Sequence, residues 1–504
     1  MIARVLTVTP VGFEGALVEV ECDAKKGLPG IQIVGMGTKS VDEAKERVRS
    51  AITNTLLEFP AKKLTINLAP ADITKDGTHF DLPIALSILI VSGQLKQSEV
   101  EHAAFAGELA LDGSIRPIRG TINIAQTARE KGLKQLYVPL ENVEQAQLVA
   151  DIEVVGVSSL KALYLHLKQE IKLMTPSATL KAQKKRPRTH TLDDIYGQEQ
   201  AKRALTIAVA GRHNILLHGP PGAGKTMLAR TLLSLMPDLT ANEKIAVTKL
   251  HSLAGEIGGE IVMERPFRTP HHTTSPVALI GGGTKAKPGE ISLAHLGVLF
   301  MDEIPEYPRS VLETLRQPME DKQIAITRAS ARTVYPADFM LVATMNPCPC
   351  GYFGDSTKEC TCAMTQILAY QKRLSGPLID RIDMVINVSR VPNDTLLAGN
   401  KTYENKQHNQ AIKMIKDAQQ SQFNRYNSRD IYNASLSSSH VQKQIILAPE
   451  AKSLLSAASS KLGLSARSYF KVIKLARTIA DMELAPIVGK NHVSEALQYR
   501  GQTS

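Results

Sequence analysis

Gly219-Pro220-Pro221-Gly222-Ala223-Gly224-Lys225-Thr226 is the most informative segment of this 504-residue sequence for its fold class. It follows an apolar run, residues 214–218, and precedes a helical pattern, which is the strand–loop–helix setting of a nucleotide-binding P-loop. Glycines let backbone N–H groups turn toward phosphate oxygens at the positive end of a helix. We predict that Lys225 contacts the β- and γ-phosphates of ATP and that Thr226 ligates Mg²⁺.

Two carboxylates end a second apolar strand pattern, residues 298–303 (VLFMDE). In P-loop enzymes, an Asp on a neighbouring strand belongs to the metal shell, and we assign this role to Asp302. Glu303 can orient and deprotonate the attacking water. A strand that ends in Asp-Glu carries little information alone, but together with the P-loop it predicts ATP hydrolysis rather than binding only.

Strand and helix patterns divide the chain into four parts. Alternating buried strands and helices in residues 192–391 predict an α/β core with a parallel sheet. Residues 1–168 mix strand and helix patterns, which predicts an α+β domain. Residues 169–191 form a basic linker with almost no large apolar side chains, and a solvated charge run is its simplest interpretation. Residues 392–504 are mainly helical and predict a lid domain.

Helical periodicity in the last part predicts an apolar helix face. Val472, Leu475, Ala476 and Ile479 recur at the spacing of one such face. The polar stretch 400–439 is compatible with a long exposed helix or with a segment that orders on binding.

Composition excludes several classes of protein. Lys and Arg number 60 against 49 Asp and Glu, so the net charge of +11 favours a polyanionic partner. Aromatic residues are only 4% and tryptophan is absent, which argues against base stacking as the main binding device. Five cysteines do not suggest a secreted disulfide framework. No signal peptide is evident, and the longest apolar run, residues 82–91, is about half a bilayer span, so we expect a cytoplasmic protein without a membrane segment.

The order of these motifs resembles that of AAA+ ATPases. Residues 264–276 (ERPFRTPHHTTSP), 281–294 (GGGTKAKPGEISLA), 375–383 (SGPLIDRID) and 465–481 (SARSYFKVIKLARTIAD) more specifically resemble the magnesium-chelatase-like AAA+ proteins of the YifB type. The resemblance covers nearly the whole chain. It implies a helix-two insert, a ring-shaped hexamer and an ATP-driven motor. For the competence proteins of this type it implies a DNA helicase that promotes branch migration during natural transformation and homologous recombination.

Three more residues complete the site if this resemblance holds. It implies that Asn346, at the end of the strand pattern 339–346, positions the lytic water. Arg381 would reach the γ-phosphate bound by a neighbouring subunit, a contribution of about 10³–10⁵ in rate in other P-loop enzymes. Arg467 would sense nucleotide from the lid. Without the resemblance, an ordinary surface ion pair is the simpler role for each arginine.

Residues 1–168 resemble the proteolytic domain of Lon-type proteases. The likeness lies in residues 74–86 (TKDGTHFDLPIAL) and 113–128 (GSIRPIRGTINIAQTA). His79 stands where that family has its serine nucleophile, and Ile122 where it has its lysine. Because a Ser–Lys mechanism needs both groups, we predict a catalytically dead domain that serves as a scaffold or handles DNA. A lone His79 is expected to be structural.

Two hairpin patterns predict where DNA binds. Residues 281–287 carry Lys285 and Lys287 at a glycine-rich tip, and residues 324–334 carry Arg328 and Arg332 around a turn. Such cations contact phosphates without reading sequence. Solvated loop tips are the alternative.

Four of the five cysteines form a cluster in the sequence. Cys348, Cys350, Cys360 and Cys362 are arranged as C-x-C, nine residues, C-x-C. Four thiolates suit a structural Zn²⁺ ion, although this spacing is tighter than usual; reduced, unligated thiols are the open alternative. The adjacent pair His271-His272 is expected to pack or hydrogen-bond rather than to bind a metal.

The sequence favours a hexameric, ATP-driven translocase that moves single-stranded or branched DNA. The alternative is a chelatase-type motor that remodels a protein partner, although such a subunit would not need the Lon-like domain. An ATP-dependent protease is a third class, which the missing Ser–Lys pair disfavours.

Overall fold

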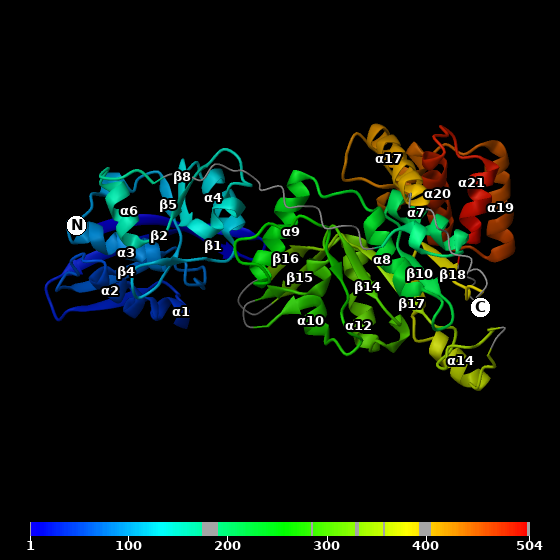
Figure 1. Cartoon of the computed structure of the whole chain (residues 1–504), viewed down its shortest axis with the longest axis horizontal. Helices are drawn as coiled ribbons and strands as arrows, with labels where there is room; N and C mark the ends of the chain where they lie inside the picture. The colour runs from blue at the N-terminus through cyan, green and yellow to red at the C-terminus, as the bar shows by residue number, and fades with distance from the viewer. Residues whose placement is uncertain are drawn as a thin grey trace.

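The computed structural model describes residues 2–173, 190–283, 286–327, 332–355, 358–392 and 405–500. Figure 1 shows an elongated molecule, with the N-terminal unit at one end, the P-loop core in the middle and the C-terminal helices at the other end. Most of the basic linker predicted at 169–191 lies outside the described residues. Within the described residues, no helix is both long and apolar enough to cross a bilayer.

A seven-stranded mixed sheet forms the N-terminal unit, in the order β3-β4-β2-β1-β5-β8-β9. β1, β2 and β4 pair antiparallel, whereas β5, β8 and β9 continue from β1 in parallel. The strands are β1 (Ile2–Val11), β2 (Glu14–Lys25), β3 (Gly30–Val34), β4 (Lys63–Ala69), β5 (Ala103–Phe105), β8 (Gln135–Pro139) and β9 (Glu153–Val157), with a separate small ribbon of β6 (Glu108–Leu109) and β7 (Ile115–Arg116).

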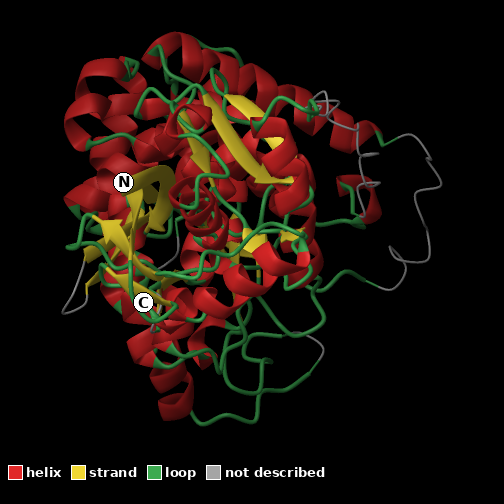
Figure 2. Cartoon of the chain, turned by 90° about the vertical axis from the view of Figure 1, so that its left-hand side faces the viewer, coloured by secondary structure: helices red, strands yellow, loops and turns green. Residues whose placement is uncertain are grey.

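Helices bury this sheet, and Figure 2, viewed from the side of this unit, shows them around the strands. Helix α3 (Asp81–Val91) packs on β1 and β2 and is buried from Asp81 to Ile90, so it is enclosed rather than amphipathic. Helix α4 (Thr121–Glu130) belongs to a second apolar cluster that also includes α5. The other helices are α1 (Lys39–Asp42), α2 (Ala44–Asn54), α5 (Val143–Ala146) and α6 (Leu160–Leu167).

The core contains a five-stranded sheet in which every neighbouring pair is parallel, in the order β11-β14-β17-β10-β18. The strands are β11 (Phe267–Arg268), β14 (Val298–Met301), β17 (Met340–Met345), β10 (Ile215–His218) and β18 (Met384–Asn387). Because the strands are parallel, their carboxyl ends share one edge, and this edge is where ligands bind in open α/β sheets. The parallel sheet predicted for the core is therefore present.

Helices and two short hairpins surround the core sheet. The hairpins are β12 (Gly281–Gly282) with β13 (Lys287–Pro288), and β15 (Gln323–Thr327) with β16 (Arg332–Pro336). The core helices are α7 (Glu199–Gly211), α8 (Lys225–Leu235), α9 (Ala241–Ala254), α10 (Pro276–Ile280), α11 (Glu290–Leu293), α12 (Arg309–Thr314), α13 (Arg316–Asp321), α14 (Met364–Gln371) and α15 (Gly376–Ile379).

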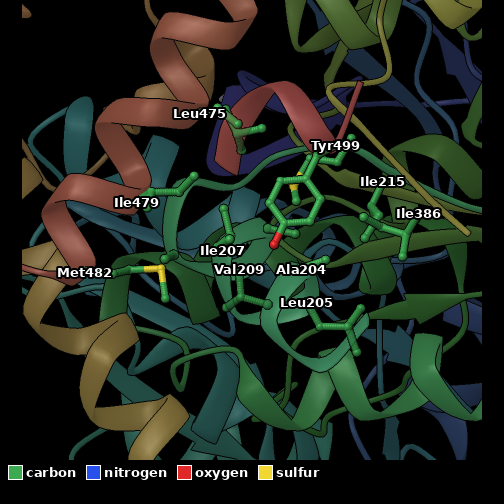
Figure 3. Close-up of a cluster of buried hydrophobic side chains, with 14 of the residues drawn as sticks. Ala204, Leu205, Ile207, Val209, Ile215, Ile386, Leu475, Ile479, Met482 and Tyr499 are labelled. Atoms are coloured by element: carbon green, nitrogen blue, oxygen red, sulfur yellow. The ribbon is translucent and has the colours of Figure 1, made fainter. Parts of the chain in front are cut away.

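Among residues 405–500, five α-helices pack together and share one apolar cluster with the core. They are α17 (Lys406–Tyr426), α18 (Ser438–Gln444), α19 (Pro449–Leu462), α20 (Ala466–Met482) and α21 (Lys490–Gln498). Figure 3 shows Leu475, Ile479 and Met482 of α20 together with side chains of α7 and of strands β10 and β18. The apolar face predicted for residues 472–479 is buried here. Helix α17 is long, as the sequence suggested, but one of its faces is buried against α7 and α20.

Candidate nucleotide-binding site

The phosphate loop begins where the central strand β10 ends. A Cβ built on Gly219 would lie 2.1 Å from the carbonyl oxygen of Val388, so only glycine fits at this close approach. Gly224 has a φ of +85° and forms the N-cap of α8, which starts at Lys225. The N–H groups at the start of an eleven-residue helix therefore face the loop that phosphates would occupy.

Lys225 is held inside this loop. Its Nζ donates to the carbonyl oxygens of Gly219 (2.6 Å) and Pro220 (2.9 Å) and to Oδ1 of Asn346 (2.9 Å). Burial lowers the pKa of Lys225 from its ordinary value, while the negative charges of Asp302 and Glu303 act in the opposite direction. The ammonium group thus lies between the phosphate loop and the two carboxylates.

A threonine that the sequence analysis missed ties the two acidic residues together. Thr344, buried in β17, donates its hydroxyl to Oδ1 of Asp302 at 2.6 Å. The hydroxyl oxygen of Thr344 also accepts a hydrogen bond from the backbone N–H of Glu303 at 2.8 Å. Glu303 itself has a φ of +49°, a left-handed conformation that turns the chain just after β14. The available signal was a polar residue in an otherwise apolar strand, two residues before Asn346.

Asn346 connects the acidic residues to the phosphate loop. Its Nδ2 donates to Oε1 of Glu303 at 3.0 Å, while its Oδ1 accepts from Lys225. One side-chain amide therefore contacts both the general-base candidate and the phosphate-binding lysine. The structure brings together Lys225, Asp302, Glu303 and Asn346 at the carboxyl edge of the sheet, and these residues suit a nucleotide with its Mg²⁺ ion.

Arg381 and Arg467 lie together at a different place. Arg381 pairs through Nη2 with Oε2 of Glu320, and Arg467 donates from Nη2 to Oε1 of the same carboxylate at 2.7 Å. Arg381 also donates to the carbonyl oxygen of Pro377 at 2.8 Å. Pairing with Arg381 lowers the pKa of Glu320, although burial acts in the opposite direction and Arg467 adds to the lowering.

This arginine pair occupies the amino edge of the sheet. The carbonyl oxygen of Arg381 accepts a hydrogen bond from Asn214, the residue before β10, at 3.1 Å. The phosphate loop begins after the other end of β10, and four extended residues span about 13 Å. Arg381 and Arg467 are therefore separated from the phosphate loop of their own chain by the depth of the sheet.

A cavity of about 600 Å³ opens at the arginine pair, between the core and the C-terminal helices. Its lining contains more cations than anions. The cations are Arg212, Lys322, Arg381, Arg467, Lys471 and Lys474, and the anions are Glu320, Asp338, Asp380 and Asp383. Such a surface suits an anionic group from outside the chain.

The four cysteines converge just after Asn346. Their sulfur atoms all lie within 4.8 Å of one another, and the Sγ–Sγ distances from Cys348 are 3.3 Å to Cys350 and 3.6 Å to Cys360. The backbone N–H of Tyr352 lowers the pKa of Cys350 to about 5. Tetrahedral Zn–S bonds of about 2.3 Å place sulfurs about 3.8 Å apart, so the arrangement fits four thiolates around one ion. The rings of His271 and His272 lie in a tilted arrangement with centroids 4.1 Å apart; both residues are exposed, and His271 is hydrogen-bonded to Thr273.

The two hairpins with predicted DNA contacts lie against each other. The hydroxyl of Tyr335 in β16 donates to the carbonyl oxygen of Ala286 at 2.9 Å. Lys287 donates its Nζ to the carbonyl oxygen of Ala254 at 3.1 Å, so it is turned toward the end of α9. Arg332 is exposed at the start of β16. Lys285 and Arg328 lie outside the described residues.

His79 and Ile122, which stand at the positions compared with the Lon-type catalytic pair, are both buried in the N-terminal unit. The ring of His79 lies against that of Phe80 in a tilted arrangement with centroids 4.2 Å apart, and its Nε2 has no hydrogen-bond partner. Burial lowers the pKa of His79 to about 4, so the ring is neutral near pH 7. Ile122 is fully buried in α4. These side chains suit a packed interior.

Comparison with known proteins extends over almost the whole chain. The family described as "Magnesium chelatase, subunit ChlI" matches residues 191–396, "Subunit ChlI of Mg-chelatase" matches residues 20–142, and "Magnesium chelatase, subunit ChlI C-terminal" matches residues 405–500.

Individual proteins show the same likeness. "Competence protein ComM" of Haemophilus influenzae is 40% identical over 504 residues, which cover 99% of this chain and 97% of that protein. The protein YifB of Escherichia coli is 40% identical over 498 residues, or 97% and 95% of the two chains. The "Magnesium-chelatase 67 kDa subunit" of Chlorobaculum parvum is 26% identical over 157 residues, or 31% of this chain and 23% of its own. The chain therefore belongs to the magnesium-chelatase-like AAA+ family of the ComM and YifB type.

Proposed function

We propose that this protein is a cytoplasmic, ATP-hydrolysing motor that works as a homo-hexameric ring and acts on DNA. The observation that carries the proposal is the placement of the nucleotide residues and the arginine pair at opposite edges of one sheet. Each chain therefore carries the nucleotide-binding half of a catalytic site at one edge of its sheet and the arginine half at the other edge. A head-to-tail ring joins these halves at every subunit interface.

Within one half-site, the roles follow from the contacts described above. The loop N–H groups and Lys225 bind the phosphates, and Thr226 and Asp302 would hold Mg²⁺, which supplies charge neutralisation when bound. Glu303 orients the attacking water and accepts its proton. Asn346 fixes the carboxylate of Glu303 relative to Lys225.

The neighbouring subunit supplies the other half. Its Arg381 would stabilise the negative charge that develops on the γ-phosphoryl group. Its Arg467, bound to the same carboxylate from a lid helix, would report nucleotide contact to the C-terminal helices. Glu320 keeps the two guanidinium groups side by side.

A mixing experiment tests this arrangement. Lys225→Ala chains and Arg381→Ala chains should each be inactive as ATPases. A random 1:1 mixture should regain activity, because about a quarter of its interfaces would combine an intact phosphate loop with an intact arginine. Mixing Lys225→Ala with Glu303→Gln is the matched control, because both lesions are in the same half-site and no interface is repaired. No recovery in the first mixture would contradict the shared site.

The DNA proposal is supported by three observations. The chain has a net charge of +11, two cationic hairpins lie side by side, and one of its relatives is named as a competence protein. We infer that the hairpins contact the DNA backbone through Lys285, Arg328 and Arg332, and through Lys287 when DNA replaces its hydrogen bond to the carbonyl oxygen of Ala254. The activity would be branch migration of single-stranded or branched DNA during natural transformation and homologous recombination.

A second candidate is a chelatase-type motor that remodels a protein partner. The match of residues 20–142 to a family described as "Subunit ChlI of Mg-chelatase" favours this candidate, because the N-terminal region is then no argument against a chelatase-type function. Single-stranded DNA should raise ATP turnover if the first proposal is right. Turnover that is indifferent to DNA but rises with a protein partner would favour the second.

We further propose that Cys348, Cys350, Cys360 and Cys362 hold a structural Zn²⁺ ion. Their sulfurs are arranged close to tetrahedral contact distances. All four positions would be filled by sulfur, so the ion would have no open site for catalysis.

A further inference from the structure

The cysteine cluster lies directly against the phosphate loop. Gly351, between the two cysteine pairs, has a φ of +87°, and a Cβ built on it would lie 2.5 Å from Cγ and 2.6 Å from Cδ of Pro221. Pro221 is the third residue of the phosphate loop. The backbone of the cysteine segment therefore packs on this loop without room for even a methyl group.

Arg390 makes a second contact between the two segments. It donates a long hydrogen bond of 3.4 Å to the carbonyl oxygen of Pro221. Its guanidinium also lies 5.4 Å from the ring centroid of Tyr352 and pairs with Asp355 at 3.4 Å. Tyr352 and Asp355 both belong to the cysteine segment, so Arg390 links that segment to the phosphate loop from another side.

The third link is the chain itself. Cys348 is fully buried and follows Asn346 by two residues. Between them, the carbonyl oxygen of Pro347 accepts a hydrogen bond from Gln371 at 3.2 Å. Asn346 carries the amide that contacts both Lys225 and Glu303. A rigid anchor at Cys348 therefore limits how far this amide can move.

We propose that Zn²⁺ bound by the four thiolates braces the ATP site, and that metal occupancy sets the rate of ATP hydrolysis. The ion closes the segment that begins at Cys348 into one rigid unit. That unit contacts Pro221 of the phosphate loop through Gly351, and it is joined to Asn346 of the ATP site through the chain at Cys348. The measurement of ATP turnover rests on the proposed ATPase function, whereas the measurements of metal binding and amide exchange do not depend on it.

The test compares the full-length protein with Cys360→Ser/Cys362→Ser. These two cysteines are the ligands farthest along the chain from Asn346, so their loss removes the metal with little direct change at the ATP site. Thr361→Ala is the matched control, because its side chain is exposed in the same segment and all four thiols remain. The measurements are zinc content, the charge-transfer absorption of added Cd²⁺, amide exchange in the phosphate loop, and ATP turnover.

The wild type and Thr361→Ala should bind an equimolar amount of Zn²⁺ or Cd²⁺, and the double variant should not. In the double variant, amide exchange in the phosphate loop should accelerate. Its kcat should fall about tenfold or more, since small displacements of catalytic groups have effects of this size. KM for ATP should change much less.

Two results would overturn the proposal. One is a reduced wild type that binds neither metal; the other is a metal-free variant with unchanged exchange and turnover. If the wild type hydrolyses no ATP at all, the proposed function fails, while metal binding and amide exchange still decide this inference.

Discussion

Arg381, just before strand β18 of the core sheet, and Arg467, in the first turn of helix α20, bind the two oxygens of one carboxylate. Glu320 is that carboxylate, and it joins parts of the chain that are far apart in sequence. This pairing places two guanidinium groups on one surface, away from the phosphate loop of the same chain.

Removal of Arg381 should abolish turnover without abolishing nucleotide binding. We expect Arg381→Ala to lower kcat by about 10³-fold or more, because a finger supplied in trans contributes 10³–10⁵ in rate in other P-loop enzymes. ATP affinity, measured with a fluorescent analogue, should change little. Arg373→Ala is the control, since Arg373 pairs with Glu306 rather than with Glu320. A fast Arg381→Ala enzyme would refute the role.

Glu303→Gln should bind ATP yet hydrolyse it very slowly. The amide keeps the size of the carboxylate but cannot accept a proton from water, so general-base catalysis worth about 10²–10⁴ is lost. Single-turnover assays with bound ATP separate this chemical step from binding. Near-normal turnover would rule out water activation by Glu303.

Thr344 should matter although it touches no substrate. Thr344→Val keeps the shape of the side chain but leaves Asp302 and the N–H of Glu303 without their shared hydroxyl. An unmade buried hydrogen bond costs about 1–3 kcal/mol, so we expect kcat to fall about fivefold to a hundredfold. Thr344→Ser retains the hydroxyl and should recover most of the rate. Equal loss in both variants would indicate a packing role only.

Acid should weaken the N-terminal unit through His79. Its folded pKa is about 4 against an ordinary value of 6.5, so the unfolded chain binds a proton that the folded chain excludes between these values. This stabilising contribution is complete above about pH 6.5 and is lost as the pH falls toward 4. Urea unfolding at pH 5 and pH 7.5 should show a smaller difference for His79→Gln than for the wild type.

Comparison of the wild type with His79→Gln separates the effect of His79 from that of the nearby Asp81. Burial raises the pKa of Asp81 to about 6, against the effect of Arg47, so Asp81 stabilises the fold at low pH and loses this contribution as the pH rises. Its effect opposes that of His79 and is common to both proteins. An identical pH dependence in both would contradict the buried, neutral ring.

The hairpin cations should control the response to DNA. Lys285→Ala with Lys287→Ala should weaken stimulation of the ATPase by single-stranded DNA and leave basal turnover intact. If six or more phosphates are contacted, DNA affinity should fall about 10³-fold or more between roughly 50 and 200 mM salt. The double variant should show a shallower salt dependence with no change in sequence preference.

Local pattern was enough to predict the core of the nucleotide site. A P-loop needs only a strand, a glycine-rich turn and a helix that are adjacent in the chain, and residues 214–235 contain all three. Asp302 and Glu303 were also expected at the site because a strand that ends in two carboxylates accompanies a P-loop, whereas Asn346 was expected there only from the family resemblance. The hairpin of residues 324–334 was evident from its alternation alone.

Contacts between distant segments could not be predicted in this way. In the sequence, Thr344 is one more residue of a buried strand. Only the fold places its hydroxyl between the carboxylate of Asp302 and the backbone N–H of Glu303. Helix α3 has the apolar content of a core helix, but its enclosure on all sides depends on which elements surround it.

The sequence was sufficient to predict a P-loop and a second strand that ends in two carboxylates, because each motif lies within one short segment; the fold then places β17 between that strand, β14, and the P-loop strand β10. The pairing of Arg381 and Arg467 with Glu320, and the contact of the cysteine segment with Pro221, are evident only in the folded chain. The physical reason is that both relationships arise from the packing of helices and loops onto the sheet, which no local periodicity encodes.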